Sequence, residues 1–176
     1  LTPVAIREAM AYVATEFQNT PTAFDHADVA SAVFSRPPVG AVGLTEEQVR
    51  AANTPYECGI ARFRETSRGH IMGIGSGMLK LIVEISTRRL LGVHIVGEGA
   101  TELVHMGQAV INLGGGIDFF IDNSFNYPTL AEANKYAAGA WKRSTVTKGQ
   151  WAVLDAVQAW RRGDGRKYRS GQGHAQ

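Results

Sequence analysis

The sequence predicts an α+β domain, in which an antiparallel β-sheet has helices packed beside it. Met78–Ile85 and Leu90–Gly97 are the strongest signal, because the short Ser86–Arg89 connection suits an antiparallel hairpin. Helical patterns gather after this hairpin and do not alternate with strands. Without β-α-β alternation, a parallel nucleotide-binding sheet is not expected.

The first segment has the pattern of an amphipathic helix. Thr2 suits the N-cap and Pro3 the first helical position, where its missing N–H costs nothing. The apolar residues that recur at helical spacing are Val4, Ala5, Ala9, Val13 and Phe17.

The middle of the chain reads as two strands around a short helix. Val29–Ser35 alternates and is bounded by prolines, which predicts a strand. Val39–Glu47 turns into a short helix with Thr45 as N-cap. Tyr56–Phe63 is a second strand, and Glu65–Gly77 is loop-like and glycine-rich.

Helices dominate the chain after the hairpin. Glu98–Leu113 is helical and stops at a run of three glycines, and Ile117–Ile121 is a short helix. Leu130–Trp141 is the next helix. Further on, Trp151, Leu154, Val157 and Trp160 predict one more amphipathic helix, and the stretch 163–176 is expected to be disordered.

Composition narrows the class of protein. The chain has 176 residues, 44% hydrophobic and 19% charged, as expected for one globular domain. A net charge of +2 is no strong argument for nucleic acid. The basic stretch 161–169 is interpreted as a solvated tail, with contact to RNA or an acidic surface as the alternative. No apolar run approaches the ~20 residues needed to cross a bilayer, so no membrane partner is expected.

Motifs for metal, thiol and hydrolase chemistry are absent from the sequence. Cys58 is the single cysteine, so an internal disulfide and a Cys-x-x-Cys pair are excluded and a reducing cytoplasm fits best. The five histidines, among them His94 in a strand and His105 in a helix, show no zinc-ligand spacing. Gly73–Gly77 leads into a strand rather than a helix, so it predicts a turn and not a dinucleotide loop.

Three segments resemble, in order, blocks of one domain: the C-terminal dimerisation domain of the FAD-dependent pyridine nucleotide-disulfide oxidoreductases. They are Ala32–Glu46, Leu91–Ala109 and Phe125–Thr129. The last is similar to the family's His-Pro-Thr-x-x-Glu signature, with Tyr127 at the histidine position and Glu132 at the glutamate. The tyrosine resembles the soluble (Si-specific) pyridine nucleotide transhydrogenase branch.

The resemblance implies a role for the tyrosine. In disulfide-reducing members the histidine, oriented by the glutamate, relays protons to a thiol pair. A phenol, with an ordinary pKa near ~10, is a poor proton shuttle at neutral pH. The change is tolerable where reducing equivalents travel only as hydride, from NADPH through FAD to NAD+. Tyr127 and Pro128 are then expected to line the flavin pocket of the partner subunit, with Glu132 structural; the alternative is that Tyr127 only packs at an interface.

The beginning of the chain also resembles this family. Leu1, Thr2 and Pro3 are similar to the segment that closes the FAD domain, where a helix N-terminus faces the flavin. The implied organisation is a helix left from the FAD domain at 1–20, a dimerisation domain at 28–143 and an extension at 144–176. A start at this point implies a chain cut from a larger protein.

Three functions follow from these observations. The first is the dimerisation domain of a homodimeric FAD-dependent NAD(P)+ transhydrogenase, with its FAD and NAD(P) domains outside this chain and the fragment inactive alone. The second is the same domain of a disulfide reductase of the lipoamide dehydrogenase or glutathione reductase type. The third is a stand-alone assembly module. None of them places an FAD, NAD(P) or metal site within these residues alone.

Overall fold

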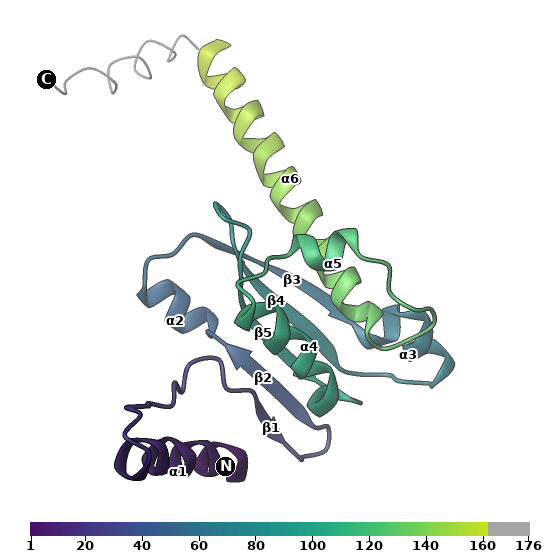
Figure 1. Cartoon of the computed structure of the whole chain (residues 1–176). Helices are drawn as coiled ribbons and strands as arrows, with labels where there is room; N and C mark the ends of the chain where they lie inside the picture. The colour runs from purple at the N-terminus through teal and green to yellow at the C-terminus, as the bar shows by residue number, and fades with distance from the viewer. Residues whose placement is uncertain (162–176) are drawn as a thin grey trace, which may run out of the picture.

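A single antiparallel sheet organises the computed structural model, which describes residues 1–161 (Figure 1). The strand order is β1-β2-β5-β4-β3. The strands are β1 (Ser31–Val33), β2 (Val39–Gly43), β3 (Tyr56–Arg62), β4 (Met78–Glu84) and β5 (Leu90–Val96). Every neighbouring pair is antiparallel, which confirms the predicted α+β class.

Helices cover one face of the sheet. α4 (Ala100–Asn112) packs on β2 and β5, and α6 (Glu132–Arg161) packs on β3 and β4. The remaining helices are α1 (Thr2–Phe17), α2 (Glu46–Ala51), α3 (Ser67–Ile71), α5 (Asp118–Asp122) and the 3-10 turn η1 (Phe63–Glu65). Figure 1 shows α5 beside the first turns of α6, at the same end of the sheet.

The core lies between the sheet and this helix layer. Alternate residues of β4, Leu79, Leu81 and Val83, are fully buried and point toward the helices. Phe63 and Phe120 are fully buried and lie at the ends of this core layer. Glycine permits the closest approach, because a Cβ on Gly59 of β3 would lie 2.1 Å from the Ala137 carbonyl oxygen of α6.

Most predicted elements are confirmed. The hairpin is formed by β4 and β5, with Arg88 in a left-handed conformation at its turn (φ 62°). The predicted helices at 98–113 and 117–121 are α4 and α5, and the predicted strand from Tyr56 is β3. Gly73 and Gly77 have φ of 68° and 104°, so the glycine-rich segment is a turn, as predicted.

Several boundaries and one assignment were wrong. Val39–Gly43 is a strand, β2, and not the approach to a helix; only the helix after Thr45 is confirmed. The strand predicted at Val29–Ser35 is reduced to Ser31–Val33. The stretch expected to be a loop contains α3, whose N-cap Thr66 accepts a hydrogen bond from the backbone N–H of Gly69.

The helix expected at 151–160 is not a separate element. It is the continuation of α6, which runs unbroken from Glu132 to Arg161 and projects beyond the sheet in Figure 1. It therefore also extends the helix predicted at Leu130–Trp141. The disorder predicted for 163–176 falls outside the described residues.

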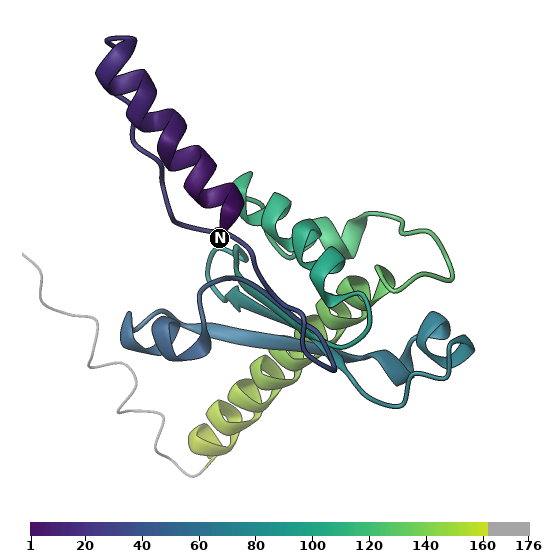
Figure 2. The ribbon, with the colours of Figure 1, turned by 90° about the horizontal axis from the view of Figure 1, so that it is seen from below.

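The N-terminal helix stands apart from the core. Leu1, not Thr2, is its N-cap, and no side chain caps it. The amphipathic pattern buries nothing: no residue of α1 is buried, and Leu1 and Phe17 are each 75% exposed. Figures 1 and 2 show α1 beside the β1 edge and outside the layer formed by α4 and α6.

Candidate functional site

The signature segment forms an anchored loop between α5 and α6. The backbone N–H of Tyr127 donates to Oδ1 of Asn126 (3.2 Å), and Oγ1 of Thr129 donates to the Asn126 carbonyl (2.8 Å). The Tyr127–Pro128 peptide bond is cis. The loop thus holds its backbone in place while the Tyr127 side chain stays 66% exposed. The arrangement leaves the phenol ring open to solvent in this chain.

Glu132 lies in the first turn of α6, below this loop. Its Oε2 is buried and has no hydrogen-bond partner among the described residues. Within the same part of the chain, no hydrogen bond joins Glu132 to Tyr127. The signature implies that the glutamate orients the side chain at the histidine position. Glu132 does not make that contact with Tyr127 in the described structure.

The other predicted cofactor residues lie at a separate place. Leu1, Thr2 and Pro3 begin α1, on the β1 side of the sheet, whereas the Tyr127 loop is beside α5 and α6 (Figures 1 and 2). One copy of the chain does not bring the two groups together.

The structure adds neighbours of Tyr127 that the sequence did not indicate. Arg64 and His70, from η1 and α3, line the same surface depression as Tyr127. They precede Tyr127 by more than fifty residues and belong to no common motif. Only the tertiary fold reveals this grouping.

His94 and Cys58 are half-buried, and His105 is exposed. Nε2 of His94 is buried without a partner in the described structure, and burial lowers the pKa of this imidazole. His105 is exposed on α4, with Nδ1 3.0 Å from Oε1 of Gln108. Burial raises the pKa of the Cys58 thiol to about 11, so it is not a reactive thiolate at neutral pH.

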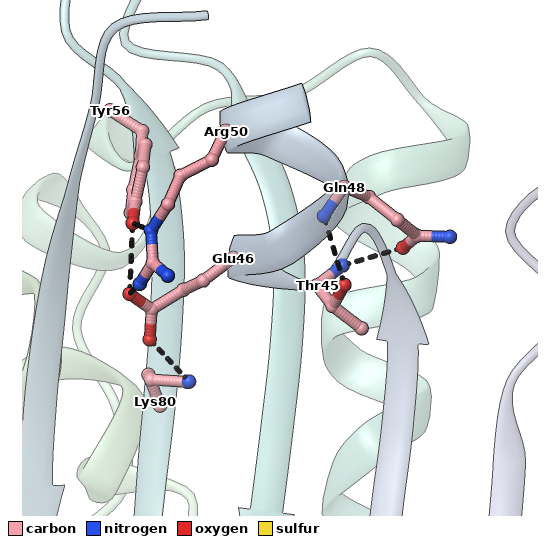
Figure 3. A network of polar contacts seen from close by, with 6 residues as sticks. All are labelled: Thr45, Glu46, Gln48, Arg50, Tyr56 and Lys80. Carbon is pink, nitrogen blue, oxygen red and sulfur yellow. Dashed lines mark hydrogen bonds and ion pairs between the residues drawn. The ribbon is translucent and has the colours of Figure 1, made fainter. Parts of the chain in front are cut away.

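A second polar cluster joins α2 to the face of the sheet opposite α4 and α6 (Figure 3). Oε1 of Glu46 accepts from Nζ of Lys80 (2.7 Å), and Oε2 accepts from Arg50 and from the Tyr56 hydroxyl, both at 2.9 Å. The hydrogen bond from Lys80, then that from Tyr56, holds the pKa of Glu46 at about 2. The cluster ties α2 to β3 and β4, so we assign it to stability.

We expect this cluster to make the domain acid-sensitive. The pKa of Glu46 is lower in the fold than its ordinary value of 4.5, so its stabilisation is fully present above about pH 4.5 and is lost as the pH falls toward 2. Glu46→Gln should lower the free energy of unfolding at pH 7 by about 1–2 kcal/mol. It should also make the free energy of unfolding fall less steeply between about pH 4.5 and pH 2. Urea denaturation across pH 2–7 measures both effects.

Glu47→Gln is the matched control for this prediction. Glu47 is the next residue, is exposed and forms no ion pair within the described residues. It should leave the free energy of unfolding within about 0.5 kcal/mol of the parent. Equal losses for the two variants would contradict the role given to the Glu46 cluster.

Two features are absent from residues 1–161. No group of three or more His, Cys, Asp and Glu side chains is placed to hold a metal ion there. No helix in that range is both long and apolar enough to cross a bilayer.

Comparisons with known proteins confirm the resemblance to the dimerisation domain. Residues 29–138 match the family described as pyridine nucleotide-disulphide oxidoreductase, dimerisation domain. A soluble pyridine nucleotide transhydrogenase of Mycobacterium bovis is 51% identical over 106 residues, which are 60% of this chain and 23% of the relative. A protein of the same name from Escherichia coli is 40% identical over 114 residues, 63% of this chain and 24% of the relative. The chain thus spans about a quarter of the length of these relatives.

Solved structures share the fold. The HOCl-induced flavoprotein disulfide reductase RclA from Escherichia coli aligns with a TM-score of 0.70 and 24% identity, over 77% of this chain and 31% of that one. Its Cu(II) complex aligns at 0.71 and 23% identity, over 79% and 32%. At this identity the likeness concerns the arrangement of sheet and helices alone.

Proposed function

This chain belongs to the pyridine nucleotide-disulphide oxidoreductases, whose dimerisation domain it carries, and on that premise we propose that it is the assembly domain of a transhydrogenase-type flavoprotein. The complete protein would be a homodimer that transfers hydride between NADPH and NAD+ through FAD. This chain holds neither nucleotide-binding domain, so the fragment is inactive alone. A reducing cytoplasm remains the proposed location.

The exposed, anchored Tyr127 is the observation that carries this proposal. A ring 66% exposed on a fixed loop is placed to contact a second subunit. We assign Tyr127 and Pro128 to one wall of the partner's flavin pocket, and Glu132 to support of the loop. No proton transfer is required of the phenol, because the flavin, when bound, supplies hydride chemistry on its own.

The N-terminus of α1 is a second observation in favour of the same proposal. No side chain caps its N-terminus, so its first backbone N–H groups are free to face an anionic group. We propose that Leu1, Thr2 and Pro3 approach the flavin of their own subunit. Each flavin would then be contacted by α1 of one subunit and the Tyr127 loop of the other, which requires a two-fold interface.

A disulfide reductase is the second candidate, favoured by the shared fold alone. The coding sequence upstream separates the two. A Gly-x-Gly-x-x-Gly motif without a Cys-x4-Cys pair supports the transhydrogenase, and a redox cysteine pair supports the reductase. A genuine start codon at Leu1 would favour the stand-alone module instead.

Restoring the family's histidine tests the role of Tyr127. In the full-length flavoprotein, Tyr127→His should keep NADPH-to-NAD+ transhydrogenation within about tenfold of the parent, since hydride transfer needs no acid or base at this position. Stopped-flow reduction of the flavin by NADPH measures the first half-reaction, and steady-state turnover measures the complete transhydrogenation. Loss of transhydrogenation with normal flavin content would overturn the tolerant role given to Tyr127.

A further inference from the structure

The segment that follows α1, residues 18–28, folds back along that helix and is fastened to it at two places. Oγ1 of Thr15 donates to the Thr22 carbonyl (3.2 Å) and accepts from the Thr22 backbone N–H (3.0 Å). Further along, Nε2 of His26 lies 2.6 Å from Oε1 of Glu8. Because both ends of this return segment are tied to the helix, α1 and the return segment form one unit.

This unit is joined to the sheet at one end only. No residue of α1 is buried, and residues 18–23 are exposed. Burial begins where the return segment leads into β1: residues 28–30 are half-buried, and Ala30 packs against the core. Asp28 has a left-handed backbone conformation there (φ 56°), so the chain changes direction at this residue. The direction of α1 is therefore set near Asp28.

Gln108 of α4 holds the chain at that point. Its Nε2 donates to the Asp28 carbonyl (3.2 Å), and its Oε1 lies 3.0 Å from Nδ1 of His105. A carbonyl can only accept, so the amide nitrogen faces Asp28 and Oε1 accepts from Nδ1 of His105. Among the described residues, this is the one side-chain hydrogen bond that joins residues 1–30 to the rest of the domain. Both polar ends of the amide are in use, which fixes its orientation.

We propose that Gln108 is a positioning residue that sets the direction of α1. Its hydrogen bond holds the backbone where the return segment joins the sheet, so the start of α1 keeps one place relative to the domain. The inference rests on the proposed function in one respect, since Leu1, Thr2 and Pro3 at that start are the residues proposed to approach the flavin. Gln108 acts on them through Asp28 and the return segment.

Gln108→Met and Gln108→Lys form a matched pair of variants. Methionine has a similar length and no donor, whereas lysine keeps an N–H donor at this position. Gln108 is half-buried, so neither change empties the core. Double electron–electron resonance on the 176-residue chain measures the spread of α1 positions. Spin labels are attached at Glu16→Cys on α1 and Glu102→Cys on α4, both exposed, with Cys58→Ala removing the native thiol.

Gln108→Met should raise the fraction of label distances outside the parent's main peak about fivefold, because one hydrogen bond is lost. Gln108→Lys should keep that fraction within about twofold of the parent, because the donor is retained. A parent-like distribution in Gln108→Met, or equal broadening in both variants, would overturn the role given to Gln108.

The reduction potential of the flavin in the full-length, FAD-loaded protein separates this inference from the proposed function. Gln108→Met should shift the potential to more negative values, because a displaced helix N-terminus stabilises a reduced, anionic flavin less. Gln108→Lys should keep the parent potential. A broadened distance distribution with an unchanged potential would contradict the flavin contact of α1 and leave the positioning role of Gln108 intact.

Discussion

Gly59→Val should strongly destabilise the domain. A Cβ at Gly59 would lie 2.1 Å from the Ala137 carbonyl oxygen and 2.9 Å from Cβ of Trp141, so α6 would have to move off β3. Neither contact is the flexible end of a side chain. Overpacking typically costs about 1–3 kcal/mol and occasionally more, and the contact with backbone puts Gly59→Val at the upper end of that range, a large part of a typical domain's stability. Urea denaturation followed by far-UV circular dichroism measures the loss.

Gly75→Val is the control for this substitution. A Cβ at Gly75 meets no atom within 4 Å, so the same side chain has room there. We expect its free energy of unfolding to remain within about 0.5 kcal/mol of the parent. If Gly59→Val proved as stable as Gly75→Val, the close packing of α6 on β3 would be wrong.

Phe63→Ala should have a comparable effect by the opposite mechanism. Phe63 is fully buried, and its ring lies against the backbone of Gly77 and Gly97. Removing the ring leaves a cavity between the end of the sheet and η1. A cavity of this kind typically lowers the free energy of unfolding by about 3–5 kcal/mol. Differential scanning calorimetry should show a fall in Tm of more than about 10 °C for a domain of this size.

Phe34→Ala removes the same ring from an exposed position. Phe34 is 85% exposed in the β1–β2 connection, so its loss should change Tm by less than about 3 °C. A similar fall in Tm for both phenylalanine variants would contradict the placement of Phe63 in the core.

The elements that local chemistry specifies were predictable from sequence. The β4–β5 hairpin follows from two apolar runs and a short polar turn. Thr45 forms the expected cap: its side chain accepts from the Gln48 N–H, while Oε1 of Gln48 accepts from the Thr45 N–H. The Gly114 stop of α4 adopts the left-handed conformation that favours glycine.

Strand β2 was missed because its glycines serve tertiary contacts. Gly40 lies under α4, where a Cβ would be 2.4 Å from the Ala100 carbonyl oxygen, and Gly43 lies equally close to the Leu91 carbonyl. From sequence alone, two glycines in five residues indicate a turn. Only the packed helix and the neighbouring strand explain them.

The signature residues of the candidate site could be predicted from the sequence, but the residues that surround them could not. Tyr127 and Glu132 stand out because they occupy a recognisable pattern. Arg64 and His70 have no such pattern, since their position beside Tyr127 depends on how η1 and α3 pack at the end of the sheet. Local sequence carries no information on that contact.

The central claim is that Tyr127 of one subunit contacts the flavin of its partner. The most direct measurement is the flavin fluorescence lifetime of the full-length, FAD-loaded protein, because a phenol in contact with a flavin quenches its emission. Tyr127→Leu should lengthen the lifetime, and dilution of the parent into monomers should lengthen it equally. Tyr136→Leu, which alters a half-exposed tyrosine of α6, is the control and should change nothing. An unchanged lifetime in Tyr127→Leu dimers would contradict the account.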